Sequence, residues 1–276
     1  MIMSPLDRPF SLAIVPLDKI FLHETVDPHR VERLVRRLET DQVLVNPPVV
    51  IEAGDRYVVL DGATRTTAFK QLGYPHIAVQ VVAPDENLIL HTWFHTIRNL
   101  NPVELLKRLN NLPEVVLLEH ESPKALGAVL ARKRLCYLHT VDDRIFLVRP
   151  APGVDDLAAL NKVTQTYIDT SQLTRTLTTD MALLRQEYPD LSALVVFPQY
   201  TVEQVLQIAR NGQLLPSGIT RFIIPGRVLR VNIDLSYLKA DCSLAEKNEW
   251  LQQLLTDKLA QGRIRYYQEP VYLLDE

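Results

Sequence analysis

The segment Leu60–Thr67 brings together residue types that bind phosphate, at a point where a strand is expected to give way to a helix. The first backbone N–H groups of a helix have no partners inside it, and the helix dipole adds partial positive charge at that end. Anions bind readily there. The residues expected to contact a phosphate through amide, hydroxyl or guanidinium groups are Gly62, Ala63, Thr64, Arg65 and Thr66.

Asp61 stands directly before this turn and carries the opposite charge to Arg65. A carboxylate beside a phosphate site is repulsive unless a metal ion or a substrate hydroxyl lies between them. Asp61 is therefore a candidate magnesium ligand or general base. The simpler alternative is an ordinary capped helix start with an exposed arginine, because Asp and Thr caps are common.

Glu24 is a second candidate for acid–base chemistry. It lies in His23-Glu24-Thr25, a predicted loop shortly before Pro28. A loop carboxylate near a nucleotide can accept a hydroxyl proton or hold a metal. The alternative is a solvated surface glutamate, the commoner state of this residue.

Four further residues are candidate substrate-binding groups: Trp93, His95, Thr220 and Arg221. The alternative for Trp93 and His95 is packing in the core. Thr220 and Arg221 interrupt an apolar strand, and an arginine buried there would need an anion or a carboxylate. The alternative is an edge strand whose arginine points outward. The sequence contains no Walker loop, no HExxH and no GxSxG.

Composition limits the classes of function. The chain has 276 residues, a net charge of −3 and two cysteines far apart in sequence. Non-specific nucleic-acid binding usually requires a basic excess, which is missing here. The cysteines fit neither a disulfide framework nor a zinc site, which points to a reducing compartment. No signal peptide or membrane span is predicted, so we expect a cytoplasmic protein that does not enter the membrane.

Periodicity and turn residues predict the elements that would position these groups. In the first hundred residues the order is strand, helix, hairpin, helix, strand, a compact α+β unit. The helix after Pro28 is amphipathic, and the hairpin turns at Gly54-Asp55. Further helices are predicted at 88–98, 102–109, 155–171, 174–187, 202–211 and 244–261, a short element at 126–131, and strands at 144–148, 194–197, 219–224, 227–233 and 264–274.

The order of these segments resembles a known family. Val15-Pro16-Leu17-Asp18-Lys19-Ile20, then Leu22-His23-Glu24-Thr25, then Val58–Arg65 with a helix ending Leu72-Gly73-Tyr74-Pro75, is similar to the ParB/sulfiredoxin-like superfamily. Thr92-Trp93-Phe94-His95, Gly218–Phe222 and Glu269–Leu274 extend the resemblance to its free L-serine kinases. The resemblance implies an α+β fold: a nucleotide-binding domain over 1–84, and a mixed α/β domain over 85–276 that packs against it and completes the substrate cleft.

The resemblance also implies an activity: phosphorylation of the hydroxyl of free L-serine by ATP or ADP with Mg²⁺. The product, O-phosphoserine, would enter a siderophore- or cysteine-type biosynthetic pathway. Glu24 and Asp61 would be catalytic, with Asp61 also holding the metal, and Gly62 to Thr66 would bind phosphate. One departure is Thr64, which stands where those kinases carry histidine in Asp-Gly-x-His-Arg. Threonine can donate a hydrogen bond but offers no imidazolium charge, so this departure concerns turnover more than nucleotide binding.

Two other functions remain open at this point. The first is a non-catalytic transcriptional regulator that senses a nucleotide or ligand, which the missing histidine favours and the acidic balance opposes where DNA contact is concerned. The second is a ParB-type CTPase clamp, ranked last because no DNA-reading helical region is evident. The sequence does not choose between ATP, ADP and CTP, and it leaves a homodimer open.

Overall fold

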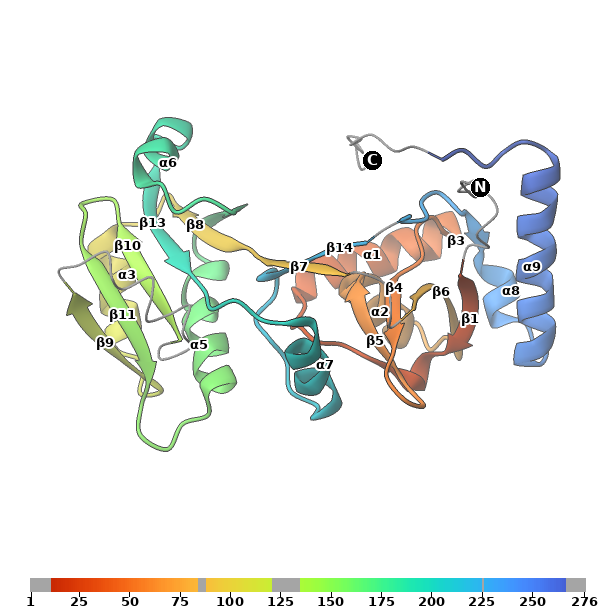
Figure 1. The fold of residues 1–276 in the computed structure, drawn as a ribbon, viewed down its shortest axis with the longest axis horizontal. Helices are drawn as coiled ribbons and strands as arrows, with labels where there is room; N and C mark the ends of the chain where they lie inside the picture. The colour runs from red at the N-terminus through yellow and green to blue at the C-terminus, as the bar shows by residue number, and fades with distance from the viewer. Residues whose placement is uncertain (1–10, 84–87, 121–134, 225, 267–276) are drawn as a thin grey trace, which may run out of the picture. The chain divides into compact units, whose positions relative to one another are not determined.

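The computed structural model describes residues 11–83, 88–120, 135–224 and 226–266 (Figure 1). The chain forms two compact units. The first unit consists of the described residues of Met1–Ile20, Pro28–Glu86 and Gly226–Glu276, and the second of those of Phe21–Asp27 and Asn87–Pro225. Neither unit is a single stretch of sequence, so each is built from segments that are distant along the chain.

The first unit is organised by a five-stranded sheet with the order β1-β6-β4-β5-β2. The strands are β1 (Leu12–Pro16), β2 (Ile20–Phe21), β4 (Val49–Glu52), β5 (Tyr57–Asp61) and β6 (His76–Val82). β4 pairs antiparallel with β5 and parallel with β6, and β1 pairs antiparallel with β6. The predicted hairpin is therefore confirmed, and Gly54 takes the left-handed conformation in its turn, with φ of 76°.

The helices of this unit come before and after the hairpin in the sequence. They are α1 (Pro28–Asp41), α2 (Ala63–Gln71), α8 (Leu235–Lys239) and α9 (Leu244–Ala260), with the short 3-10 turn η2 (Leu17–Lys19). α1 packs against α2 and buries Val31 and Leu38, as its amphipathic spacing predicted. The small pair β3 (Val43–Leu44) and β15 (Ile233–Asp234) completes this unit.

α9 protects an edge of the sheet. Strand β1 lies at one end of the strand order, where unpaired backbone groups invite association with other chains. Asn248 of α9 pairs with both backbone groups of Ile14: the Ile14 N–H donates to Asn248 Oδ1 at 2.8 Å, and Asn248 Nδ2 donates to the Ile14 carbonyl at 2.9 Å. The side chain of Gln252 donates to the Leu12 carbonyl. These side chains replace the missing neighbouring strand.

The second unit contains a six-stranded antiparallel sheet with the order β12-β8-β13-β10-β11-β9. Its strands are β8 (Phe94–Arg98), β9 (Val115–His120), β10 (Cys136–Thr140), β11 (Ile145–Pro150), β12 (Gln172–Thr176) and β13 (Leu191–Val196), and its helices are α3 (Pro102–Asn110), α5 (Asp156–Ile168), α6 (Met181–Glu187) and α7 (Val202–Arg210). Every residue of β13 is buried, as expected for a central strand. A separate ribbon pairs β7 (Ile89–Thr92) with β14 (Thr220–Ile223).

The mixed α+β class is confirmed, but several predicted elements were wrong. Residues 88–98 form β7 and β8 instead of a helix, because each strand finds a partner more than 70 residues away. The predicted helix 174–187 is divided into β12 and α6. Residues 227–232 form no strand, and β14 pairs with β7 and not with the segment that follows it. The predicted element 126–131 and most of the strand 264–274 lie outside the described residues.

The division into units also differs from two consecutive domains over 1–84 and 85–276. Gly226–Glu276 groups with the first unit, because α8 packs on β6 and α9 packs on β1. Phe21–Asp27 groups with the second unit, where Glu24 forms a parallel bridge with Leu215. In the part of the chain that the structure describes, no helix is both long and apolar enough to cross a bilayer.

Candidate functional site

The start of α2 has the form of an anion-binding helix end. β5 ends at Asp61, and Gly62 turns the chain with φ of 97°, a left-handed conformation that favours glycine. Gly62 is the N-cap of α2, and no side chain caps this helix start. The N–H groups of the first turn are therefore available to an external acceptor. Pro48 and the Arg65 guanidinium lie so close to Gly62 that an added Cβ would be 3.0–3.1 Å from them.

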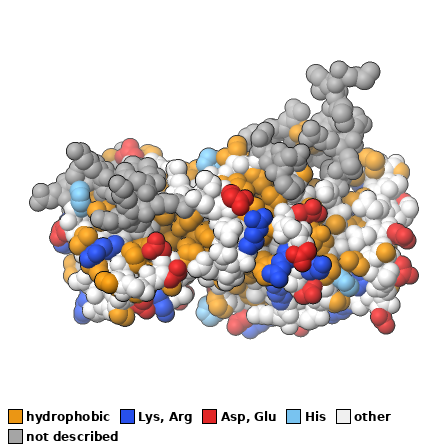
Figure 2. Space-filling view, turned by 60° about the horizontal axis from the view of Figure 1, so that its bottom comes forward, with side chains coloured by type: hydrophobic (Ala, Val, Ile, Leu, Met, Phe, Trp, Pro, Cys, Tyr) orange, Lys and Arg blue, Asp and Glu red, His pale blue; other side chains and the backbone are white. Residues whose placement is uncertain are grey.

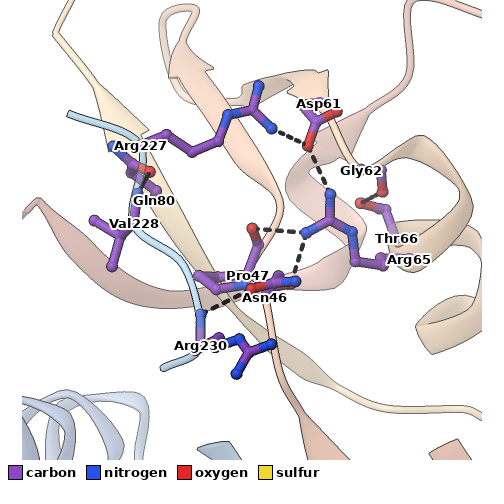
Figure 3. A network of polar contacts seen from close by, with 10 residues as sticks. All are labelled: Asn46, Pro47, Asp61, Gly62, Arg65, Thr66, Gln80, Arg227, Val228 and Arg230. Carbon is purple, nitrogen blue, oxygen red and sulfur yellow. Dashed lines mark hydrogen bonds and ion pairs between the residues drawn. The ribbon is translucent and has the colours of Figure 1, made fainter. Parts of the chain in front are cut away.

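Asp61 forms the centre of a charged network at this helix start (Figure 3). Its Oδ2 accepts from Arg65 Nη2 at 2.6 Å and from Arg227 Nη1 at 2.9 Å. Arg65 Nη1 also donates to the carbonyls of Asn46 and Pro47, at 2.7 and 3.0 Å. Burial alone would raise the pKa of Asp61, but the two guanidinium charges and their hydrogen bonds lower it below its ordinary value. The carboxylate is therefore ionised at neutral pH, and the network has one positive charge in excess.

The structure brings Asp61, Gly62, Ala63, Thr64 and Arg65 together, as predicted, but not Thr66. The Thr66 side chain is fully buried, and its hydroxyl donates to the Gly62 carbonyl at 3.2 Å. It therefore points into the helix and not toward a ligand. Thr64 is partly exposed, on the first turn.

The geometry at Gly62 leads to a prediction about stability. Gly62→Ala should destabilise the protein by about 2 kcal/mol, since alanine is strained at positive φ and its Cβ would contact the Pro48 backbone. Urea unfolding measures the loss. Gly54→Ala is the matched control, because Gly54 has φ of 76° and open space around it. Equal losses at the two positions would show that the close approach to Pro48 has no energetic effect.

Glu24 is held in the second unit by donors from a distant segment. Its Oε2 accepts from the Gly218 N–H at 3.0 Å and from the Thr220 hydroxyl at 3.2 Å. The Thr220 hydroxyl in turn lies 2.8 Å from Nε2 of His23, which is buried. Because the hydroxyl donates to Glu24, the histidine nitrogen is the donor in this contact. Oε1 of Glu24 has no partner among the described residues, which leaves it able to accept a proton.

Backbone pairing fixes this glutamate in place. The Leu215 N–H donates to the His23 carbonyl, and the Thr25 N–H donates to the Leu215 carbonyl, both at 2.8 Å. The Thr25 hydroxyl accepts from the Ser217 N–H at 3.0 Å. A short two-strand contact therefore surrounds Glu24, although the two segments are some 190 residues apart in the chain. Glu24 and Thr220, two of the candidate residues, therefore lie in one cluster.

Trp93 and Arg221 lie together, but on the other face of β14. The Arg221 guanidinium carbon is 4.6 Å from the centre of the Trp93 ring, a cation–π contact. Successive side chains of a strand point to opposite faces, so Arg221 and Thr220 leave the ribbon in opposite directions. Arg221 is exposed, which agrees with the alternative that this arginine points outward from an edge strand. The ribbon thus separates the Trp93–Arg221 pair from the Glu24–Thr220 pair.

His95 contacts Gly218 of the Glu24 cluster and has no exposed surface. Its Nε2 donates to the Gly218 carbonyl at 3.3 Å, and its Nδ1 accepts from the Tyr167 hydroxyl at 2.9 Å. A ligand cannot reach this ring as the structure has it, so the predicted substrate contact of His95 has no geometric support. The residue instead positions Gly218, whose N–H binds Glu24.

The burial of His95 predicts a pH-dependent stability. Desolvation lowers the pKa of His95 to about 4, so between pH 6.5 and 4 the unfolded chain binds a proton that the folded chain does not. Stability should therefore fall as the pH drops through this window, by on the order of 3 kcal/mol from this residue. Urea unfolding of the wild type and His95→Gln at pH 7 and 4.5 checks it. A His95→Gln variant with the same loss as the wild type would contradict the assignment.

The sequence patterns did not predict that two further arginines lie near these clusters. Arg227 follows Gly226 in a segment that was predicted to be a strand, and nothing in its spacing indicated a contact with Asp61. Arg175 of β12 packs its guanidinium directly against Gly218, which leaves no room for a Cβ there. Gly218 has φ of 74°. A glycine beside a predicted site was the only sequence signal for this close approach.

The charged network can supply only part of the ligands of a magnesium ion. Among the described residues no group of three or more His, Cys, Asp or Glu side chains could hold a metal. Mg²⁺ is commonly held by one or two carboxylates together with substrate phosphates, and Asp61 can supply one such carboxylate. The residues present therefore suit a metal that arrives with a phosphate ligand.

Comparison with known proteins places the chain in a family. It is 30% identical over 270 residues to the "ATP-dependent L-serine kinase SbnI" of Staphylococcus aureus (strain NCTC 8325 / PS 47), which covers 96% of this chain and 97% of that protein. It is 26% identical over 239 residues to an "ATP-dependent L-serine kinase" of Staphylothermus marinus, across 82% of this chain and 90% of that one.

Solved structures agree with this relationship. SbnI with a C-terminal truncation, from Staphylococcus aureus, superimposes with a TM-score of 0.69 and 26% identity over 90% of this chain and 97% of that chain. A free serine kinase in complex with AMP shares the fold, with a TM-score of 0.73 and 17% identity over 84% of this chain and 95% of that chain. No protein-family profile matches the sequence. Near-complete coverage at 30% identity, with the same fold, shows that the chain belongs to the family of ATP-dependent L-serine kinases.

Proposed function

We propose that this protein transfers the γ-phosphoryl group of ATP to the hydroxyl of free L-serine, giving O-phospho-L-serine and ADP. The names of its relatives and the length over which they match support this activity. The structural observation that carries it is Glu24, a carboxylate fixed through one oxygen by two donors while its other oxygen has no described partner. A fixed acceptor of this kind suits proton removal from an alcohol.

In the first unit, the start of α2 would bind the nucleotide phosphates. The amides of Gly62, Ala63 and Thr64 are directed outward from the helix start, and the Thr64 hydroxyl adds a donor. Arg65 contributes positive charge while it holds Asp61 in place. Mg²⁺, bound by Asp61 together with the nucleotide, would neutralise phosphate charge and stabilise the charge on the departing ADP.

In the second unit, Glu24 would act as the general base. Its free oxygen accepts the proton of the serine hydroxyl as the serine oxygen forms a bond to the γ-phosphorus and the bond between that phosphorus and the β,γ-bridging oxygen breaks. The electron pair of the broken bond stays with ADP. Thr220 and the Gly218 N–H keep Glu24 oriented. Trp93 and Arg221, which contact each other across the ribbon from Glu24, form the proposed contact surface for the amino acid.

Phosphorus NMR tests the proposed function directly. Purified protein is incubated with Mg²⁺, L-serine and either ATP or ADP, with D-serine and L-homoserine as matched acceptors. We expect a phosphomonoester signal for O-phosphoserine that requires L-serine, and the two donors in parallel identify the nucleotide. Nucleotide hydrolysis without the O-phosphoserine signal, or no turnover at all, would overturn the kinase activity.

Thr64 is the one observation that favours a second function. The family's histidine is missing at this position, so a protein that binds nucleotide without turnover, and acts as a regulator, is the alternative. On the face that Figure 2 shows, Lys and Arg side chains of the described residues lie among Asp and Glu side chains, which does not favour broad DNA contact. Nucleotide binding without product, together with a salt-dependent mobility shift of a promoter fragment, would support the regulator.

A further inference from the structure

An irregular segment of the first unit is held over the start of α2 by side chains that bind its backbone. We call this segment, Gly226–Asn232, the strap. Gln80 of β6 contacts it twice: its Nε2 donates to the Gly226 carbonyl at 3.1 Å, and its Oε1 accepts from the Val228 N–H at 2.9 Å. Asn46 accepts from the Arg230 N–H at 2.8 Å (Figure 3). Polar side chains of the sheet and of a neighbouring loop thus specify its path.

The backbone of the strap is also unusual. Arg230 and Asn232 have φ of 55° and 54°, in the left-handed region that residues with a Cβ seldom adopt. Such conformations persist only where surrounding contacts impose them, and they concentrate at sites that bind ligands. The Asn232 N–H donates to the Val45 carbonyl at 3.3 Å, which fixes the end of the strap. The strap is therefore a specified structure and not a loose connection.

This path of the strap places Arg227 beside Asp61. Arg227 differs from Arg65 in the number of its partners and in its exposure. The Arg65 guanidinium has three acceptors, the Asp61 carboxylate and two carbonyls, and its side chain is 24% exposed. Within the described residues Arg227 has one partner, Asp61, and its side chain is 35% exposed. Arg65 can therefore hold Asp61 alone, while Arg227 can exchange its single contact for another anion.

We propose that Arg227 is a phosphate-binding residue, which exchanges Asp61 for a phosphate oxygen when a nucleoside diphosphate or triphosphate occupies the start of α2. This assignment rests on the proposed function, and it adds to that function a cation 166 residues from Asp61 along the chain. The network already carries two guanidinium groups against one carboxylate. An incoming phosphate group would restore the charge balance, and a guanidinium binds its oxygens through paired donors.

The test is nucleotide binding measured by isothermal titration calorimetry, with ADP and ATP in the presence of Mg²⁺. Arg227→Gln keeps a donor for Asp61 and removes the charge. We expect its Kd for both nucleotides to rise about tenfold or more, as for the loss of one charge-assisted contact. Arg227→Lys, which keeps the charge but loses the paired donors, should fall between this variant and the wild type. Arg36→Met, an exposed arginine of α1, is the control and should bind like the wild type.

The outcomes separate this inference from the proposed function. A wild type that binds nucleotide, with an unchanged Kd in Arg227→Gln, overturns the role of Arg227 and leaves the kinase proposal intact. A wild type that binds neither nucleotide overturns both. Urea unfolding of each variant monitors the fold. If Arg227→Gln does not fold, Arg227→Lys decides in its place: a loss of about threefold or more supports the role, and an unchanged Kd overturns it.

Discussion

Glu24→Gln should lower the turnover of L-serine by about 10²–10⁴-fold while the protein stays folded, the usual contribution of a general base. Glutamine keeps a carbonyl oxygen that can accept from the Gly218 N–H and the Thr220 hydroxyl, so the hydrogen bonds that hold the side chain survive. It cannot take a proton from the serine hydroxyl. Steady-state assay of O-phosphoserine, with kcat and KM determined separately, measures the effect.

The loss should be in kcat, with little change in the KM for ATP, because the proposed mechanism assigns Glu24 to the chemical step and not to nucleotide binding. Glu203→Gln, on the exposed surface of α7 in the same unit, is the matched control and should behave like the wild type. A Glu24→Gln enzyme with wild-type kcat would remove this residue from the mechanism.

Asp61→Asn should reduce kcat/KM for Mg-ATP by about 10²-fold, the scale associated with losing one electrostatic contact to the transition state. Asparagine offers one neutral oxygen where the carboxylate now accepts from both Arg65 and Arg227. It also loses the charge through which Mg²⁺ would be held. The concentration of Mg²⁺ that gives half-maximal activity should therefore rise.

Activity measured as a function of Mg²⁺ concentration checks this expectation. Asp55→Asn, at the exposed turn of the hairpin between β4 and β5, is the control in the same unit. If Asp61→Asn lost activity but kept the wild-type dependence on Mg²⁺, Asp61 would serve only to position the two arginines, and the metal would be held elsewhere.

Local sequence patterns predicted the parts of the fold that depend on neighbouring residues. The spacing of Val31 and Leu38 gave α1, and the turn at Gly62 gave the start of α2, because each is decided within a few residues. The local pattern of residues 88–98 predicts a helix, whereas the structure has β7 and β8 there, since their strand pairing is set by β14 and β12, far away in sequence. No local pattern contains that information.

The difference between features set by neighbouring residues and features set by distant ones also applies to the candidate site. Asp61, Gly62 and Arg65 are close in sequence, and their cluster was predicted. The contacts of Glu24 with Gly218 and of Asp61 with Arg227 join positions more than 160 residues apart. Thr66 had the right residue type at the right spacing, but helix geometry turns its hydroxyl to the backbone. The roles proposed for these residues come from the family resemblance and not from spacing.

The discontinuous first unit has a consequence for how the protein is made. During translation, the ribosome synthesises the five strands of this unit's sheet before residues 226–266, which contain α9 and Arg227. Until residues 226–266 emerge, the backbone of Ile14 lacks the side chain of Asn248, and the carboxylate of Asp61 lacks one of its two guanidinium partners. Edge protection and the second guanidinium contact of Asp61 therefore arrive together, after the strands of the sheet, so the nascent chain passes through a stage with a sheet edge open to association.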